Sequence, residues 1–253
     1  MKEVTSIEQL QKKETSEQYV QIYALSYLPE LNAPSASRLR SYLPANEQAR
    51  YDCIPTWSKR LEFVVSRIFL RRILGIVLKQ VPSQLCFVAT EYGKPELHHP
   101  ETTQPAIFFN LSHTEGYMTL AVTRYGEVGI DVEMLASYQD RIARRFFHPD
   151  EYAWLQQLER AQQAPAFYRI WTIKEACVKA LGYGLQFPLR EIRTVPETAG
   201  QCLDLWWQAL DLWPETRCAI AVHRKGDVPF TRPRIAPVVY LNQEWLSSRE
   251  SHQ

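Results

Sequence analysis

The segment "IFFNLSHTEGYMTLAVTRYGEVGIDVEM" at residues 107–134 decides the fold, because it predicts successive strands with turns at Glu115-Gly116 and Tyr125-Gly126. Part of this segment returns later in the chain. "AVTRYGEV" at 121–128 and "AVHRKGDV" at 221–228 share Ala, Val, Arg, Gly and Val, with Glu replaced by Asp. Two unrelated hairpins can share that much by chance. A true repeat predicts instead a chain of two similar α+β halves that meet near the Tyr125-Gly126 turn.

The rest of the chain supplies strands and helices for both halves. The expected strands are at 19–28, 202–211 and 216–224, and the expected helices at 58–80, 148–163 and about 165–181. We therefore expect an α+β fold of two similar halves, each a small antiparallel sheet packed with helices. The expected divisions are a flexible N-terminus at 1–18, a first half at 19–125, a second half at 126–240 and a tail at 241–253.

Composition narrows the class of protein. The net charge of the 253 residues is +1, which gives no overall electrostatic case for binding nucleic acid or an acidic membrane. The five cysteines form no CxxC pair, so neither a zinc site nor a disulfide framework is expected. The most apolar segment is interrupted by Arg67, Arg71 and Arg72, and the N-terminus lacks a signal-peptide core. These features predict a reduced, cytoplasmic protein.

The motif "GIDVE" places two carboxylates on one face of a strand. Asp131 and Glu133 are two residues apart, so they point to one side while Ile130 and Val132 point to the other. A half-exposed strand with a solvated acidic face would explain the pair. A hard divalent cation would also relieve the repulsion between the two carboxylates.

The motif "WTIKEACVKALGYGL" at 171–185 belongs to a helix that is apolar almost all round. Thr172, Glu175 and Lys179 form a polar stripe that is only about 60° wide. A surface salt bridge between Glu175 and Lys179 would suit their spacing. An exposed helix would show a wider polar face, however, so the two charges are expected to line a cleft.

Three further features carry polar groups. Arg60, Arg67 and Arg71 share one side of the helix at 58–80, as either a solvated face or a groove for a polyanion. "YGKP" at 92–95 predicts a tight turn that offers backbone groups and one lysine. "NLSH" at 110–113 ends in small and polar side chains, although a lone His113 is more often structural than a ligand.

In this order and at these intervals, "YGKP", "NLSH", "GIDVE" and "WTIKEACVKALGYGL" resemble the 4′-phosphopantetheinyl transferases, in their larger surfactin-synthetase-activating form. The match covers roughly residues 20–190. The resemblance implies transfer of the phosphopantetheine arm of coenzyme A to a serine of an apo acyl or peptidyl carrier protein. It also implies Mg²⁺, release of adenosine 3′,5′-bisphosphate, and one active site in a cleft between two similar halves.

The resemblance also implies roles for individual residues. Asp131, Glu133 and Glu175 are expected to hold Mg²⁺, and Glu175 is also the expected catalytic base. Lys179 is expected to contact the pyrophosphate as a catalytic residue, with Lys174 in a weaker supporting role.

Coenzyme A binding is expected to involve the segments "YGKP" and "NLSH". Gly93, Lys94 and Pro95 resemble the turn that holds the adenine end, and Ser112 and His113 match positions that meet the phosphates. Arg60 or Arg50 is a candidate for the 3′-phosphate. These assignments complete the expected cofactor-binding set.

Two other classes of protein would fit part of this pattern. A Mg²⁺-dependent phosphohydrolase could use the same three carboxylates, but "YGKP" and "NLSH" would then have no role. A non-catalytic relative that binds coenzyme A would be expected to have lost an acid or Lys179. The expected partners are coenzyme A and a carrier protein, without nucleic acid or membrane. A monomer is expected, because two halves in one chain supply their own interface.

Overall fold

The computed structural model describes residues 19–27, 33–91, 93–98, 107–184, 187–194, 197–202, 204–224 and 232–247. Tyr92 and Leu185, which the motifs include, lie outside these ranges, as do the expected flexible residues 1–18 and residues 225–228 of the second copy of the repeated segment. No helix within the ranges combines the length and hydropathy needed to cross a bilayer.

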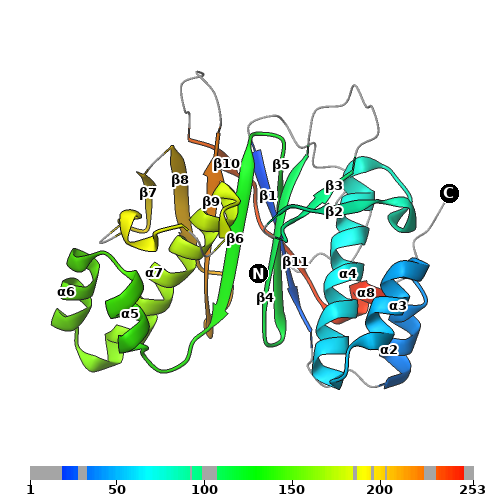
Figure 1. Ribbon diagram of the computed structural model, residues 1–253, viewed down its shortest axis with the longest axis horizontal. Coiled ribbons are helices and arrows are strands. Elements are labelled where there is room, and N and C mark those ends of the chain that lie inside the picture. The colour runs from blue at the N-terminus through cyan, green and yellow to red at the C-terminus, as the bar shows by residue number, and fades with distance from the viewer. Residues whose placement is uncertain are drawn as a thin grey trace.

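The first half contains one strand, a group of helices and two hairpins (Figure 1). Its elements are β1 (Tyr19–Ser26), α2 (Ala33–Arg40), α3 (Ala45–Cys53), α4 (Trp57–Leu78), η1 (Pro82–Gln84), β2 (Phe87–Ala89), β3 (Pro95–Leu97), β4 (Phe108–Thr114) and β5 (Tyr117–Thr123).

The second half repeats this order, and the chain then returns to the first half. The repeated elements are β6 (Glu127–Met134), α5 (Asp140–Phe146), α6 (Pro149–Gln157), α7 (Arg160–Leu181), η3 (Leu189–Glu191), β7 (Ala199–Cys202), β8 (Leu205–Leu210) and β9 (Thr216–His223). The returning elements are β10 (Arg234–Ile235), β11 (Val239–Leu241) and α8 (Gln243–Ser247).

The sheets show that the two halves are similar. In the first half β5 lies between β1 and β4, and in the second half β9 lies between β6 and β8. The last helix before each hairpin, α4 or α7, has 22 residues. The α+β fold and the two similar halves are therefore confirmed.

The C-terminal elements differ from the expected division. Strands β10 and β11 pair in parallel with β1, so residues 234–241 extend the sheet of the first half. The expected tail is also partly ordered, since α8 buries Trp245 against Phe69, with ring centroids 6.1 Å apart. Burial of this apolar side chain in the first core explains the return of the chain.

The expected helix at 148–163 is interrupted. Helix α6 ends at Gln157, and α7 begins at Arg160 rather than near residue 165. Pro165 is the sixth residue of α7, past its first turn, so the helix lacks one backbone hydrogen bond there. The α7 helix therefore extends further toward the α5–α6 end of the molecule than the sequence predicted (Figure 1).

The two halves meet where β4 and β6 run side by side (Figure 1). Alternate backbone amides of β6 donate to polar side chains of β4 instead of to its carbonyl groups. These hydrogen bonds run from Ile130 N to Asn110 Oδ1 (2.9 Å), from Val132 N to Ser112 Oγ (3.3 Å) and from Met134 N to Thr114 Oγ1 (3.3 Å). We call this contact of β4 with β6, which is made by side-chain hydrogen bonds, the β4–β6 seam. It keeps Ser112 beside the acidic residues of β6.

Helix α7 packs directly on β6 because of one glycine. A Cβ atom on Gly129 would lie 2.0 Å from the Ala176 carbonyl oxygen and 2.5 Å from the Ala180 nitrogen, so a larger residue would push the helix away. On the other face of the strand, Ile130 and Val132 enter the apolar core. The alternation of the strand therefore directs the acidic residues of "GIDVE" toward α7.

Candidate active site

Three polar side chains from three elements meet at the seam. Lys179 of α7 lies with its Nζ 2.6 Å from Asp131 Oδ1 and 3.1 Å from Ser112 Oγ. Ser112 donates to the same Asp131 oxygen at 3.0 Å. Lys179 also donates to the Ile130 carbonyl at 3.2 Å. The three residues come from the two halves, so the site is located at their interface.

Asp131 is buried, with 4% of its surface exposed, so the strand does not present the solvated acidic face that we had considered. One carboxylate oxygen, Oδ1, accepts from Lys179 and Ser112. The other, Oδ2, is buried and has no hydrogen-bond partner among the described residues. A buried, unsatisfied carboxylate oxygen is costly, which indicates that a further positive group or donor belongs there.

Glu133 and Glu175 lie close enough to Asp131 to affect each other's ionisation. Burial, and after it the negative charge of Asp131, raise the pKa of Glu133 to about 7, and a hydrogen bond from the Trp171 side chain opposes the shift. Burial and Asp131 also raise the pKa of Glu175, against the effect of Lys179. The three carboxylates thus repel one another in a partly desolvated site.

These residues fit Mg²⁺ in the type of donor they offer. Carboxylate oxygens are the ligands that Mg²⁺ prefers, and the unpaired oxygen of Asp131 is directed at no other group. The described residues nevertheless contain no ready-made cluster of three His, Cys, Asp or Glu side chains at ligand spacing. Mg²⁺ commonly takes only one or two carboxylates together with substrate phosphates, so a complete protein cage is not required.

His113 lies beside this group on β4 and is about one third exposed. Its Nε2 is 3.7 Å from Glu62 Oε1 on α4, and Lys59 in turn lies 3.0 Å from Glu62. Burial lowers the pKa of His113; Glu62 opposes this shift, while Lys179 adds to it. His113 therefore occupies a position where a phosphate could accept a hydrogen bond from its ring.

The turn "YGKP" lies at the other end of β4 and β6. Gly93 has φ of 82°, a conformation that favours glycine, and its amide donates to the Thr90 carbonyl at 2.9 Å. Lys94 Nζ lies 3.0 Å from Glu127 Oε2, so the turn is tied to the start of β6. Lys94, Pro95 and Glu127 line a pocket of about 160 Å³.

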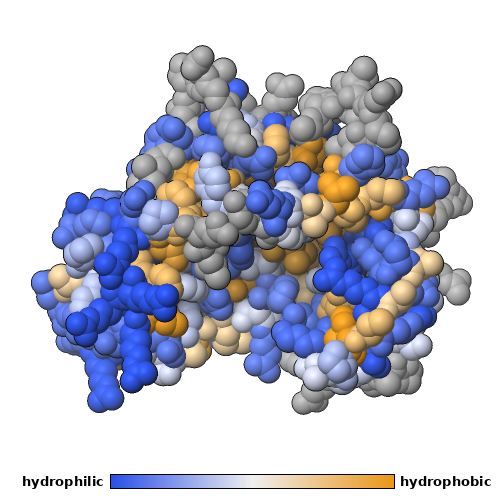
Figure 2. Space-filling model, in the orientation of Figure 1, coloured by the Kyte–Doolittle hydropathy of each residue, from blue (hydrophilic) through white to orange (hydrophobic). Residues whose placement is uncertain are grey.

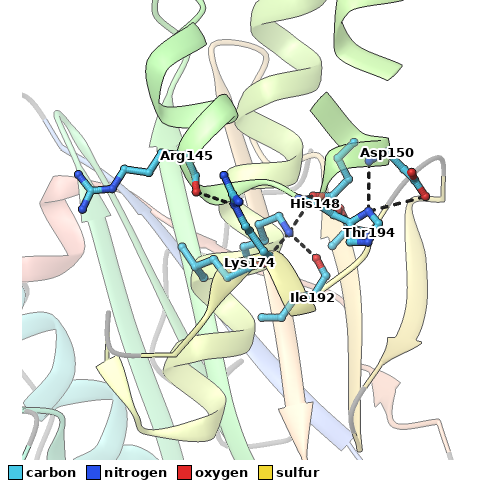
Figure 3. Close-up of polar contacts among 9 residues, drawn as sticks. Arg145, His148, Asp150, Lys174, Ile192 and Thr194 are labelled. Carbon is cyan, nitrogen blue, oxygen red and sulfur yellow. Dashed lines mark hydrogen bonds and ion pairs between the residues drawn. The ribbon is translucent and has the colours of Figure 1, made fainter. Parts of the chain in front are cut away.

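Lys174 has a different role from the one expected. It is fully buried and lies 2.8 Å from Glu151 of α6, and it donates to the carbonyls of Leu189 (2.8 Å) and Ile192 (Figure 3). Glu151 also accepts from Thr194. A lysine with no exposed surface cannot reach a cofactor, so the supporting contact assigned to Lys174 was wrong. The helix faces of Lys174 and Glu175 differ, as the sequence indicated.

The N-terminal arginines are mostly engaged within the protein. Arg71 is buried, 2.8 Å from Glu47, and so belongs neither to a solvated face nor to a groove for a polyanion. Arg60 donates to the Ile54 carbonyl and to that of Asp52 (3.2 Å) and is partly exposed. Arg50 is exposed, with its guanidinium 5.4 Å from the Phe63 ring. The structure brings neither Arg60 nor Arg50 into contact with Asp131 or Ser112.

The sequence did not lead us to two kinds of residue: the polar residues of β4 that accept hydrogen bonds from β6, and Glu151, which pairs with Lys174 of α7. Asn110 and Thr114 alternate with Ser112 along β4, and this pattern of polar residues in a buried strand was a readable signal. Glu151 gave no such signal, because an acid in the first turn of a helix is common. Only the tertiary packing shows that it pairs with Lys174.

Two family models match the chain. One, described as the 4′-phosphopantetheinyl transferase superfamily, matches residues 127–218, and the other, described as 4′-phosphopantetheinyl transferase, N-terminal, matches residues 33–124. The gap between the two matches falls at the Tyr125-Gly126 turn. Each model thus corresponds to one half of the structure.

Two individual relatives give the same result. The chain is 36% identical over 193 residues to the 4′-phosphopantetheinyl transferase HetI of Nostoc sp. The aligned region covers 74% of this chain and 81% of HetI. It is 34% identical over 126 residues to the 4′-phosphopantetheinyl transferase gsp of Aneurinibacillus migulanus, covering 50% of each. A holo-[acyl-carrier-protein] synthase of Thermotoga maritima is a weak structural match, with a TM-score of 0.32 and 22% identity over 40% of this chain and 66% of that chain.

Proposed function

The chain belongs to the 4′-phosphopantetheinyl transferase superfamily and is an enzyme of that class, and we propose that the group at the β4–β6 seam transfers phosphopantetheine from coenzyme A to a serine of an apo carrier protein. The product is the holo carrier, and adenosine 3′,5′-bisphosphate is released. The observation that supports this most directly is the meeting of Ser112, Asp131 and Lys179 at the junction of the halves, with Glu133 and Glu175 beside them.

The cations and donors at the seam would bind the pyrophosphate. Lys179 lies at the centre of the group and is 28% exposed, so its ammonium can contact an incoming phosphate while it remains near Asp131. Ser112 and His113 offer further donors from β4. Together they would offset the charge that develops on the departing bisphosphate.

Glu175 is the proposed general base. Its raised pKa brings it closer to the range in which a carboxylate accepts a proton effectively. The serine oxygen of the carrier would attack the phosphorus next to the pantetheine arm, and the bond from that phosphorus to the bisphosphate oxygen would break. The proton of the serine would pass to Glu175, directly or through water.

Mg²⁺ would be held by Asp131, Glu133 and Glu175, with oxygens of the pyrophosphate completing its coordination. When bound, it would neutralise negative charge on the pyrophosphate and on the leaving bisphosphate. The protein contributes the burial of Asp131 and the position of α7, which is fixed by Gly129. We further propose that the protein acts as a cytoplasmic monomer, because its two halves supply both sides of the site.

Intact-mass spectrometry tests the proposed activity. The protein is incubated with Mg²⁺, coenzyme A and each of several apo carriers of the acyl and peptidyl type. The expected result is a mass increase of one phosphopantetheine group on at least one carrier. No shift on any carrier would contradict the proposal.

A variant pair tests the role of Glu175. Glu175→Gln is expected to abolish the mass shift while the protein stays folded. Glu159→Gln is the matched control, because Glu159 is exposed at the start of the same helix and its side chain makes no capping hydrogen bond. Full activity of Glu175→Gln would refute its role as base.

A further inference from the structure

The buried Lys174–Glu151 pair of the second half has a counterpart in the first half. Arg71 is the fifteenth residue of α4 and Lys174 is the fifteenth residue of α7, and both helices have 22 residues. Glu47 and Glu151 are each the third residue of the nine-residue helix, α3 or α6, that lies before the long helix. The two pairs therefore occupy equivalent places in the two halves, with arginine in one and lysine in the other.

The pair of the first half holds a segment that follows α4. Arg71 Nε lies 2.8 Å from Glu47 Oε2, and Arg71 Nη1 donates to the carbonyls of Pro82 (2.8 Å) and Leu85 (2.9 Å). Pro82 begins η1 and Leu85 directly follows it. Because only 4% of the Arg71 side chain is exposed, these hydrogen bonds are shielded from water, and breaking them would leave buried groups unsatisfied.

The pair of the second half makes the same set of contacts. Lys174 donates to the carbonyls of Leu189 and Ile192, at the first residue of η3 and directly after it. Its third partner is Glu151, at 2.8 Å. In each half, a buried cation on the long helix thus holds the short 3₁₀ helix that follows, and a carboxylate from the preceding helix compensates its charge. We call these two pairs the first and the second anchor pair.

The first anchor pair holds a segment that leads into the β2–β3 hairpin. The Arg71 guanidinium lies 5.0 Å from the centre of the ring of Phe87, which begins β2. In the turn between the two strands, Lys94 Nζ lies 3.0 Å from Glu127 Oε2 and 3.3 Å from the Val128 carbonyl oxygen. Both of these partners belong to β6. The hairpin is therefore fixed to α4 of the first half at its base and to β6 of the second half at its turn.

The hairpin lies at one end of the β4–β6 seam. Residues of the hairpin, of the start of β4 and of the start of β6, among them Lys94, Phe108 and Glu127, line the pocket of about 160 Å³ beside the turn. Ser112 lies further along β4. Coenzyme A carries one arm on each side of its pyrophosphate, so a donor whose pyrophosphate lies at Ser112 extends toward both ends of the seam. The placement of the hairpin then shapes the surface that one arm meets.

We propose that Arg71 is a positioning residue for donor binding. It holds η1 and the base of the β2–β3 hairpin on α4, and thereby fixes the surface that one arm of coenzyme A meets beside the seam. This inference rests on the proposed use of coenzyme A as donor. The second anchor pair has no such role, because η3 leads to β7, which lies at the opposite edge of its sheet from β6. The same arrangement thus supports the fold in the second half and supports ligand binding as well in the first.

Two variants separate position from stability. Arg71→Met leaves Glu47 without its closest cation and is expected to lower both the stability of the protein and its affinity for coenzyme A. Arg71→Met/Glu47→Leu removes both charges, so most of the stability is expected to recover. The hydrogen bonds to Pro82 and Leu85 remain absent, so the Kd for coenzyme A is expected to stay about tenfold above that of the wild type. Urea unfolding measures the stability, and calorimetry of the full-length protein with Mg²⁺ measures the Kd.

Arg71→Lys tests the equivalence of the two anchor pairs. Lys174 shows that an ammonium at this position of the long helix reaches one carboxylate and two carbonyl groups, so Arg71→Lys is expected to bind coenzyme A with nearly the wild-type Kd. Arg40→Met is the matched control, because Arg40 pairs with Asp52 at the surface, and it is expected to leave the Kd unchanged. A loss of affinity in Arg71→Lys as large as that in Arg71→Met would overturn the proposal.

Amide hydrogen exchange tests the anchor without a ligand. In the turn of the hairpin, the amide of Gly93 donates to the Thr90 carbonyl, and that of Lys94 donates to Thr90 Oγ1. Both amides are expected to exchange faster in Arg71→Met/Glu47→Leu than in the wild type, whereas the amides of η3 are expected to keep their rates. Unchanged exchange in the turn would overturn the proposal.

The binding and the transfer results distinguish this inference from the proposed function. Weak binding by the double variant, together with a recovered stability and faster exchange in the turn, would support the role of Arg71. A wild type that modifies a carrier, together with a double variant that binds coenzyme A with the wild-type Kd, would overturn the role of Arg71 alone. A wild type that binds no coenzyme A would contradict the proposed function and this inference with it.

Discussion

Helix α7 makes two lysine–carboxylate contacts that differ in their burial and in their hydrogen bonds. Lys174 and Glu151 lie 2.8 Å apart, and both side chains are 0% exposed. Lys179 and Asp131 lie 2.6 Å apart, but Lys179 is 28% exposed. The first pair is surrounded by further hydrogen bonds, whereas one oxygen of Asp131 has no partner among the described residues.

The two pairs differ in how completely their hydrogen bonds are satisfied. This difference separates a side of α7 that supports the fold from a side that faces the proposed site. The ammonium of Lys174 has three acceptors, and the carboxylate of Glu151 accepts from His148, Thr194 and Lys174 (Figure 3). A buried pair with its hydrogen bonds complete has no capacity for a ligand. The pair that faces the seam is incomplete, and a substrate or a cation can complete it.

The two pairs also lie in different surroundings. Hydrophilic residues cover the α5–α6 end of the visible face (Figure 2). The side chains of Lys174 and Glu151 have no exposed surface. The Lys179–Asp131 pair joins α7 to β6, where the two halves meet. The buried pair therefore lies within one half, and the pair at the proposed site lies where both halves meet.

The largest expected effect comes from breaking the buried pair. Lys174→Met leaves Glu151 charged and without its cation, which is expected to lower the free energy of unfolding by about 3–5 kcal/mol. Urea unfolding followed by circular dichroism measures this change. A loss below about 1 kcal/mol would show that the pair is not the main support of α7.

A double variant distinguishes support from catalysis. Lys174→Met combined with Glu151→Leu removes both charges and is expected to recover most of the stability, because no buried charge remains. Transfer activity is expected to recover with it. A stable double variant without activity would mean that Lys174 also takes part in the reaction.

The next largest effect is expected from breaking the Lys179–Asp131 pair, in which one oxygen of Asp131 has no partner among the described residues. Lys179→Met is expected to reduce transfer by about 10²–10³-fold, since it removes a cation that offsets developing negative charge. Its loss of stability is expected to be smaller than that of Lys174→Met, because Lys179 is partly exposed. Single-turnover transfer and urea unfolding are measured on the same preparations, and activity within tenfold of the wild type would contradict the assignment.

A smaller effect is expected from the pH dependence of Mg²⁺ binding. The pKa of Glu133 rises from 4.5 to about 7 on folding, so its contribution to stability is present below pH 4.5 and is lost as the pH rises through 7. Under the proposal, Mg²⁺ would bind the ionised carboxylates and offset that loss. Mg²⁺ at ten times its Kd is expected to stabilise the protein by about 1.4 kcal/mol near pH 8, with a higher concentration needed near pH 5.5.

Thermal unfolding with and without Mg²⁺ measures this difference. The expected increase in Tm is larger at the higher pH for the wild type. Asp131→Asn is expected to reduce it at both pH values. A Tm increase that does not depend on pH would argue against the carboxylates as the ligands.

The smallest expected effect is the loss of one hydrogen bond from the buried pair. Thr194→Val removes the 2.9 Å hydrogen bond from Oγ1 to Glu151 and keeps the one from the backbone amide. The expected cost is about 1 kcal/mol in the free energy of unfolding, with transfer unchanged. A marked loss of activity would show that the support and the site are more closely coupled than their geometry indicates.

The sequence predicted those features that local pattern determines. The period of β6 directed Asp131 and Glu133 to one face. The narrow stripe of α7 predicted that Glu175 and Lys179 line a cleft, and the structure places Lys179 against Asp131 and Ser112. The first core recruits Trp245 from the far end of the chain, which no local pattern could show. Glu151 likewise lies on a separate helix from Lys174, so the partner of that lysine required the packed structure.

The most direct test of the central claim compares the two sides of α7 in one reaction. Single-turnover transfer from coenzyme A to an apo carrier is measured by intact mass for Glu175→Gln and for the double variant Lys174→Met/Glu151→Leu. The expected result is a rate at least about 10²-fold lower for Glu175→Gln and a rate close to that of the wild type for the double variant. Equal losses in both, with both proteins folded, would contradict the division of α7 into a supporting side and a catalytic side.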